Sequence, residues 1–165
     1  MTLVHMMSTD SDNTAAFDVS TAIQKSHRIL RLLAISFMAS ALIYIVVSWF
    51  LVLSGTIKPA RVDGIIPGLA LAALLSPFIG YILRTSVLAK ADRKNELQAR
   101  LSLFGQATIV YLAFAELTAI LGMVLSILCR EVVWASTFGS IAIFIILLLW
   151  PDQNEMERFV KTKKV

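Results

Sequence analysis

Four apolar stretches, separated by short polar segments, make up most of the chain. They cover residues 29–53, 65–83, 105–128 and 132–150. A helix rises about 1.5 Å per residue, so about 20 apolar residues are enough to cross a hydrocarbon core of roughly 30 Å. We therefore predict an all-α fold, a polytopic membrane helical bundle with four transmembrane helices.

The N-terminal segment, residues 1–28, precedes these stretches. Residues 1–24 carry aspartates but no lysine or arginine, which differs from the basic start of a cleavable secretory signal. The apolar spacing from about Phe17 indicates an interfacial helix that continues into the first span. A disordered polar tail explains the composition equally well, and both alternatives stay open.

Two further polar segments lie after the second and the fourth apolar stretch. The connector 84–100 has neither proline nor glycine, so we expect the second and third helices to extend beyond the membrane. In the tail, residues 151–165, Asp152 and Glu155 have the spacing of a capping box. This spacing predicts a surface helix, and the chain after it ends in basic residues.

Composition narrows the class of protein. The chain is 58% hydrophobic and 16% charged, which is too apolar for an ordinary soluble domain. Its single cysteine, Cys129, excludes an internal disulfide. Both histidines, His5 and His27, precede the first span, so we expect no buried imidazole to ligate haem or a metal. The sequence has no nucleophile–base pair and no phosphate loop, and we predict no enzymatic activity, no cofactor and no metal site.

The distribution of positive charge predicts the orientation. Twelve of the 15 lysines and arginines lie before or at the start of the first span, in the connector 84–100 or in the tail. The remaining three are Lys58, Arg61 and Arg130, on the other side. By the positive-inside rule both termini are cytoplasmic, and we place the protein in a bacterial cytoplasmic (inner) membrane. The charges flank spans instead of forming a basic patch with exposed aromatics, so nucleic acid is not an expected partner.

Tryptophans near span ends and the lysines of the tail are candidates for contact with the membrane interface. Indole rings concentrate at headgroup level, and clustered lysines attract anionic lipids. The predicted lipid-interface residues are Trp49, Trp134, Trp150, Lys161, Lys163 and Lys164.

Small residues recur at every fourth position of the second span. They are Gly68, Ala72, Ser76 and Gly80. Such spacing lets two transmembrane helices approach closely. We predict that this stripe is a helix-packing face.

Glu116 lies near the centre of the third apolar stretch. An acid at mid-bilayer costs roughly 2.5–3.5 kcal/mol on insertion scales, and such residues often mark a function. Its dry surroundings disfavour the charged form, so we expect a neutral acid while its face is closed. Ser40 and Tyr44 of the first span lie at a compatible depth and are the predicted hydrogen-bond partners.

Residues 91–130 combine a short polar loop with a helix that carries a mid-membrane acid. Ala115 precedes the acid, and Gly122 follows it by six residues. In these features residues 65–129 resemble the hairpin of the rotor proteolipid, subunit c, of rotary ATP synthases. The resemblance implies that Glu116 carries a proton or sodium ion, and that the helix with the small-residue stripe is the close-packed inner one.

Two functions from different classes follow. The first is a proteolipid-like membrane subunit in which Glu116 binds and releases a proton or another cation. The alternative is a structural, accessory or assembly subunit of a larger membrane complex, in which Glu116 is a hydrogen-bonded link between helices. Both imply the lipid bilayer as surroundings, and either a homo-oligomer or a larger complex.

Overall fold

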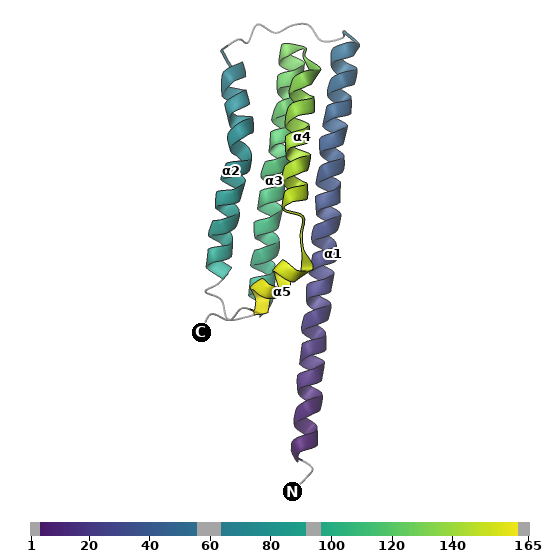
Figure 1. The fold of residues 1–165 in the computed structure, drawn as a ribbon, viewed down its shortest axis with the longest axis vertical. Helices are drawn as coiled ribbons and strands as arrows, with labels where there is room; N and C mark the ends of the chain where they lie inside the picture. Colours follow the sequence, from purple (N-terminus) through teal and green to yellow (C-terminus); the bar gives the residue numbers. More distant parts are fainter. Residues whose placement is uncertain (1–3, 56–63, 92–96, 162–165) are drawn as a thin grey trace.

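The computed structural model of the protein describes residues 4–55, 64–91 and 97–161. Side chains are described for residues 20–55, 64–90 and 98–159. The helices of this part are α1 (Val4–Leu53), α2 (Ile66–Ala91), α3 (Leu97–Cys129), α4 (Val132–Leu148) and α5 (Gln153–Lys161) (Figure 1). No strand occurs among the described residues, which confirms the all-α prediction.

Helix α1 runs without a break from the N-terminal segment into the first span. It has 50 residues, so it is about 75 Å long. Its first part extends past the other helices in Figure 1. Of the two alternatives for residues 1–28, the structure therefore has a continuous helix over the described residues, and this helix begins well before Phe17.

Three helices are long and apolar enough to cross a membrane, in the ranges Ser20–Leu53, Ile66–Lys90 and Gln98–Cys129. The predicted fourth span is shorter than expected, because α4 has 17 residues and ends at Leu148. Helix α4 is long enough to cross a membrane only together with α5, and the two helices are bent by 57° relative to each other. The helix stops there because Pro151 disfavours helical backbone at the residue before it. As expected, α2 and α3 both extend into the connector 84–100.

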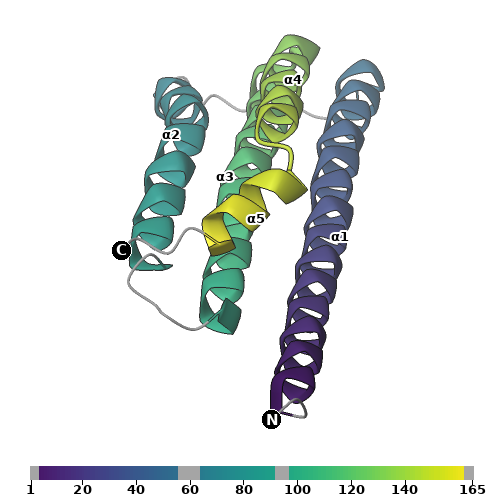
Figure 2. The ribbon, with the colours of Figure 1, turned by 60° about the horizontal axis from the view of Figure 1, so that its bottom comes forward.

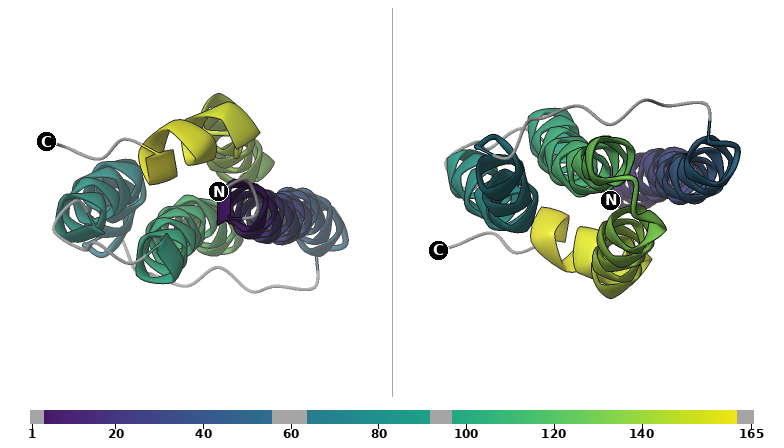
Figure 3. Two further views of the ribbon diagram at one scale, coloured as in Figure 1. Left: turned by 90° about the horizontal axis from the view of Figure 1, so that it is seen from below. Right: turned by 90° about the horizontal axis from the view of Figure 1, so that it is seen from above.

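Helix α3 is the centre of the bundle. It packs against α1, α2, α4 and α5, whereas α2 packs almost entirely on α3. Seen along the bundle, α3 lies between α2 and α1, and α4 lies beside the α1–α3 pair (Figure 3). Helix α5 crosses the end of the bundle where α3 begins (Figure 2). We call this the α5 end, and the opposite end the Arg130 end.

The packing face of α2 differs in part from the predicted stripe. Ser76 and Gly80 are buried against α3, but Gly68 and Ala72 are exposed. A step of four residues overshoots a 3.6-residue turn by about 40°, so a strict stripe winds away from its neighbour. The contact face alternates steps of three and four instead and includes Ala73, which is fully buried. Ser76 Oγ also donates a hydrogen bond of 2.8 Å to the Phe114 carbonyl of α3.

The α5 region corrects two expectations from the sequence. Asp152 caps α5, since its Oδ1 accepts the Asn154 amide at 3.3 Å. Glu155 does not complete a capping box, because its Oε1 accepts from Arg84 of α2 at 2.9 Å. Helix α5 is also more than a surface helix, because Met156 is only 1% exposed. The buried cluster at this end consists of Ile23, Leu30, Leu101, Phe104 and Met156.

His27 is buried, contrary to the expectation from its place before the first span. Its Nε2 lies 3.1 Å from the Pro151 carbonyl, where the chain turns from α4 to α5. A carbonyl only accepts, so this bond requires a hydrogen on Nε2. The imidazole therefore ties α1 to the α4–α5 turn. No group of three or more His, Cys, Asp or Glu side chains that could hold a metal ion occurs in the described part of the chain.

Candidate functional site

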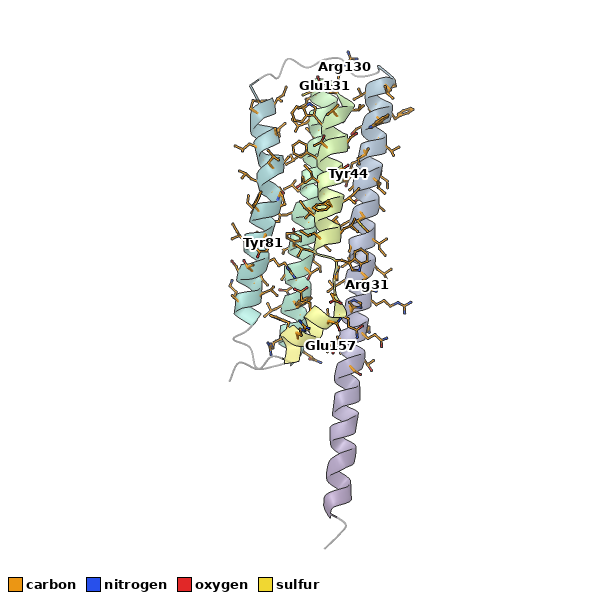
Figure 4. All side chains as sticks on the ribbon, viewed as in Figure 1. Arg31, Tyr44, Tyr81, Arg130, Glu131 and Glu157 are labelled. Carbon is orange, nitrogen blue, oxygen red and sulfur yellow. The ribbon has the colours of Figure 1, made fainter. Side chains whose placement is uncertain are left out.

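The carboxyl of Glu116 bridges α3 and α1. Its Oε1 accepts a hydrogen bond of 2.7 Å from Ser40 Oγ and one of 3.1 Å from the Tyr44 hydroxyl. Ser40 and Tyr44 lie about one turn apart on α1, so they reach the same partner. The sequence indicated either residue as a hydrogen-bond partner of Glu116, and in the structure both donate to it. Figure 4 shows Tyr44 between the charged groups of the two ends, Arg130 and Glu131 at one and Arg31 and Glu157 at the other.

A second acceptor, a backbone carbonyl, takes part in this arrangement. Ser40 Oγ lies 2.9 Å from the Phe37 carbonyl as well as 2.7 Å from Glu116 Oε1. A serine hydroxyl has one hydrogen and two lone pairs, so it donates to only one of these acceptors at a time. Phe37 was not recognisable from the sequence, because a backbone carbonyl gives no signal in a residue pattern.

The contacts suit both protonation states of the carboxyl. When Glu116 is ionised, Ser40 and Tyr44 both donate to Oε1. When Oε1 carries a proton, it donates to Ser40 Oγ. The Ser40 hydroxyl then turns and donates its own hydrogen to the Phe37 carbonyl. Tyr44 donates to Oε1 in either case. The two hydrogen-bond arrangements differ by the rotation of one hydroxyl, without any displacement of a helix.

The second carboxyl oxygen is differently placed. Among the described residues no group donates a hydrogen bond to Oε2 of Glu116. Oε2 is not fully buried, because it lacks a partner among these residues and yet is not among the buried unpaired atoms. The side chain as a whole is only partly buried. The carboxyl therefore has one oxygen fixed inside the α1–α3 contact and one that reaches its edge.

The surroundings of Glu116 are small and uncharged. Ala41, Ala119 and Ala142, from α1, α3 and α4, form a buried cluster, and Tyr44 packs against it. Alanines at these positions let the three helices approach closely. Helix α4 has no titratable side chain, and Tyr44 is the one titratable group in contact with Glu116 in the described structure. Among the described side chains, no lysine or arginine forms an ion pair with Glu116.

The predicted lipid-interface tryptophans lie near helix ends but also contact other helices or the buried core. Trp49 is 47% exposed and donates from Nε1 to Ser136 Oγ at 3.0 Å. Trp134 stacks on Phe138 at 6.1 Å between ring centroids. Trp150 packs against the buried cluster around Ala34. The side chains of Lys161, Lys163 and Lys164 lie outside the described residues, so their role stays a prediction.

Glycines at the helix contacts around the site were only partly recognised in the sequence. A Cβ on Gly122 would lie 2.5 Å from Phe138 Cβ, and one on Gly139 would lie 2.6 Å from Ile45 Cγ1. These two positions allow α4 to lie close to α3 and α1. Gly122 entered the sequence interpretation only through the rotor resemblance, and Gly139 did not enter it at all, because isolated glycines in apolar runs show no periodicity.

No protein family model, curated protein or solved structure matches the chain. The function is therefore inferred from the residues and their geometry alone.

Proposed function

We propose that the protein is a proteolipid-like membrane subunit in which Glu116 binds and releases a proton within the bilayer. The observation that carries the proposal is the asymmetry of the carboxyl. Oε1 is held by Ser40 and Tyr44, while Oε2 has no donor in the described structure and reaches the edge of the helix contact. An acid at this depth is costly, and it is usually retained for a function.

The ligand distances favour a proton over a metal cation. Both hydroxyl oxygens lie at hydrogen-bond distance from one carboxyl oxygen. A hard cation needs several oxygens around one central point, usually six or more for Ca²⁺ or Mg²⁺. Here the oxygens form a chain from Tyr44 through Glu116 and Ser40 to the Phe37 carbonyl, which is an arrangement that moves hydrogens.

The proposal includes the resemblance of residues 65–129 to the rotor proteolipid hairpin. Helices α2 and α3 lie side by side as a hairpin (Figure 1), and Gly80 allows their close approach. Gly68 and Ala72 are exposed, and they are available to a second copy or another subunit. The bacterial cytoplasmic membrane and cytoplasmic termini belong to the same proposal, on the strength of the lysine and arginine distribution.

A structural or accessory role is the second candidate. The bonds from Ser40 and Tyr44 join α1 to α3, and such interhelical hydrogen bonds contribute about 0.6–2 kcal/mol. An apolar groove of about 530 Å³ between α2 and α4, lined in part by Ala73, Pro77 and Phe138, also offers a surface to a neighbouring helix. In this case Glu116 has no need to change its protonation state.

Labelling with a hydrophobic carbodiimide separates the two. The reagent modifies protonated carboxyls in apolar surroundings, and mass spectrometry locates the modified residue in native membranes. Proton binding predicts labelling at Glu116 that falls as the pH rises. Glu116→Gln is the control that removes the label while retaining an oxygen that accepts from Ser40 and Tyr44.

Two outcomes would sink the proposal. One is a Glu116 that stays unlabelled at every pH in a correctly folded protein. The other is labelling that does not change over the accessible pH range, since this is the behaviour of a permanently protonated link between helices.

A further inference from the structure

A groove in the α1–α3 contact lies between the level of Glu116 and the α5 end. It has a volume of about 370 Å³ and is lined by residues of α1 and α3 only. Its polar side chains are Ser26 of α1 and Gln98 and Ser102 of α3. Three of its nine lining residues are thus polar and the other six are not, and the groove begins at the end of the bundle where α3 starts and α5 lies.

The residues that line the groove share a helix face with the candidate site. On α3, Ile109 lies seven residues before Glu116, and Ser102 lies seven residues before Ile109. Seven residues are close to two helical turns, so both side chains point within about 40° of the direction of Glu116. Ser26 precedes Ser40 by two steps of seven residues on α1. Because both helices run in the same direction, the groove and the Ser40–Glu116 contact are successive levels of one helix contact.

A short apolar section separates the groove from the carboxyl. The innermost lining residue on α3, Ile109, lies one step of seven residues from Glu116, about 10 Å along the axis. Leu112 is buried in this interval, and Leu33 and Phe37 pack against the same cluster. On the other side of Glu116, toward the Arg130 end, α1, α3 and α4 close around the cluster of Ala41, Ala119 and Ala142.

We infer that the groove is the route by which water delivers protons to Glu116, so that the carboxyl exchanges protons with the α5 side of the membrane. This inference rests on the proposed proton binding and adds the side of access. Ser26, Gln98 and Ser102 offer hydrogen-bonding groups to water in the outer part of the groove, and the apolar section around Leu112 is the barrier that a proton crosses. The groups that face the carboxyl are Tyr44 from α1 and the uncharged surface of α4.

Sided titration in sealed vesicles tests the route with the unaltered protein. The pH is changed on one side at a time, and labelling of Glu116 by the membrane-permeant carbodiimide is measured after a fixed time. Protein orientation is read from an N-terminal tag. Labelling should follow the pH on the side of the N-terminus, with about a tenfold fall in the protonated fraction for each pH unit above the midpoint.

The outcomes distinguish the route from the function. Labelling that follows the pH of the opposite side overturns the route and leaves proton binding intact. Labelling that follows neither side refutes proton binding itself, and the route with it.

A cysteine pair in a Cys129→Ser background provides an independent measurement on the full chain. Ser102→Cys, inside the groove, should react several-fold faster with a membrane-impermeant thiol reagent than Leu32→Cys. Leu32 is 61% exposed on α1, outside the groove lining. Modification at residue 102 should then slow the response of Glu116 labelling to pH on that side. Equal reaction rates at the two positions, or an unchanged response after modification, contradict the route.

Discussion

Gly80→Ala tests the packing on which the position of α3, and so of Glu116, depends. An added Cβ would lie 2.6 Å from Phe114 Cβ and 3.5 Å from Tyr111 Cδ2. Carbon atoms pack at about 3.5–4.0 Å, so α2 must move away from α3 by roughly 1 Å. Phe114 Cβ is attached directly to the backbone, and no rotamer change relieves the contact.

The expected cost follows from two destabilising effects and one that opposes them. Overpacking of this kind destabilises a protein by about 1–3 kcal/mol. The same displacement stretches the hydrogen bond between Ser76 Oγ and the Phe114 carbonyl, which contributes about 0.5–1.5 kcal/mol. Alanine is the better helix former by about 0.5–1 kcal/mol, which offsets part of the loss. We expect a net decrease of about 2 kcal/mol in the free energy of unfolding.

Gly68→Ala is the matched control on the same helix. A Cβ at this position meets no atom within 4 Å, so we expect a change within about 0.5 kcal/mol of zero or a small gain. Reversible unfolding in mixed micelles, followed by circular dichroism, compares the two variants. Equal losses at both positions, or an unchanged stability for Gly80→Ala, would refute the packing argument.

Three further predictions concern single contacts and use the same unfolding assay. Ser76→Ala should lower stability by about 0.5–1.5 kcal/mol through loss of its bond to α3, and a variant as stable as the native protein contradicts this. Ser40→Ala and Tyr44→Phe each remove one donor to Glu116, and each should cost about 0.6–2 kcal/mol. If neither variant loses stability, these bonds do not hold α1 to α3. Arg84→Gln removes the ion pair with Glu155, whose side chain is 51% exposed. Its cost should be at most about 1 kcal/mol and should vanish at high salt, so a loss that persists in salt argues for a packing role of Arg84 instead.

Rigid helices explain why the partners of Glu116 were predictable. With a fixed rise per residue and both helices starting on the same side, Ser40 and Tyr44 had to lie near the depth of residue 116. The positions of these residues in the first and third spans therefore indicated the contact. The hydrogen bonds of Ser40 and Tyr44 to Oε1 agree with it. That Oε2 would be left without a donor depends on side-chain geometry, and no spacing rule supplies it.

The long apolar runs were enough to predict the helical class and three helices of membrane-spanning length, because in lipid such a run satisfies its backbone hydrogen bonds as a helix. Tertiary structure decided which faces meet. Ala73 is buried while Ala72 is exposed, yet the two are the same residue type. In a bilayer, apolar residues face lipid and neighbouring helices alike, so hydrophobicity does not point toward the core. The bend after Trp150 likewise brings Pro151 against His27, which is buried there. The two residues lie far apart in the chain, so no local sequence pattern indicates their contact.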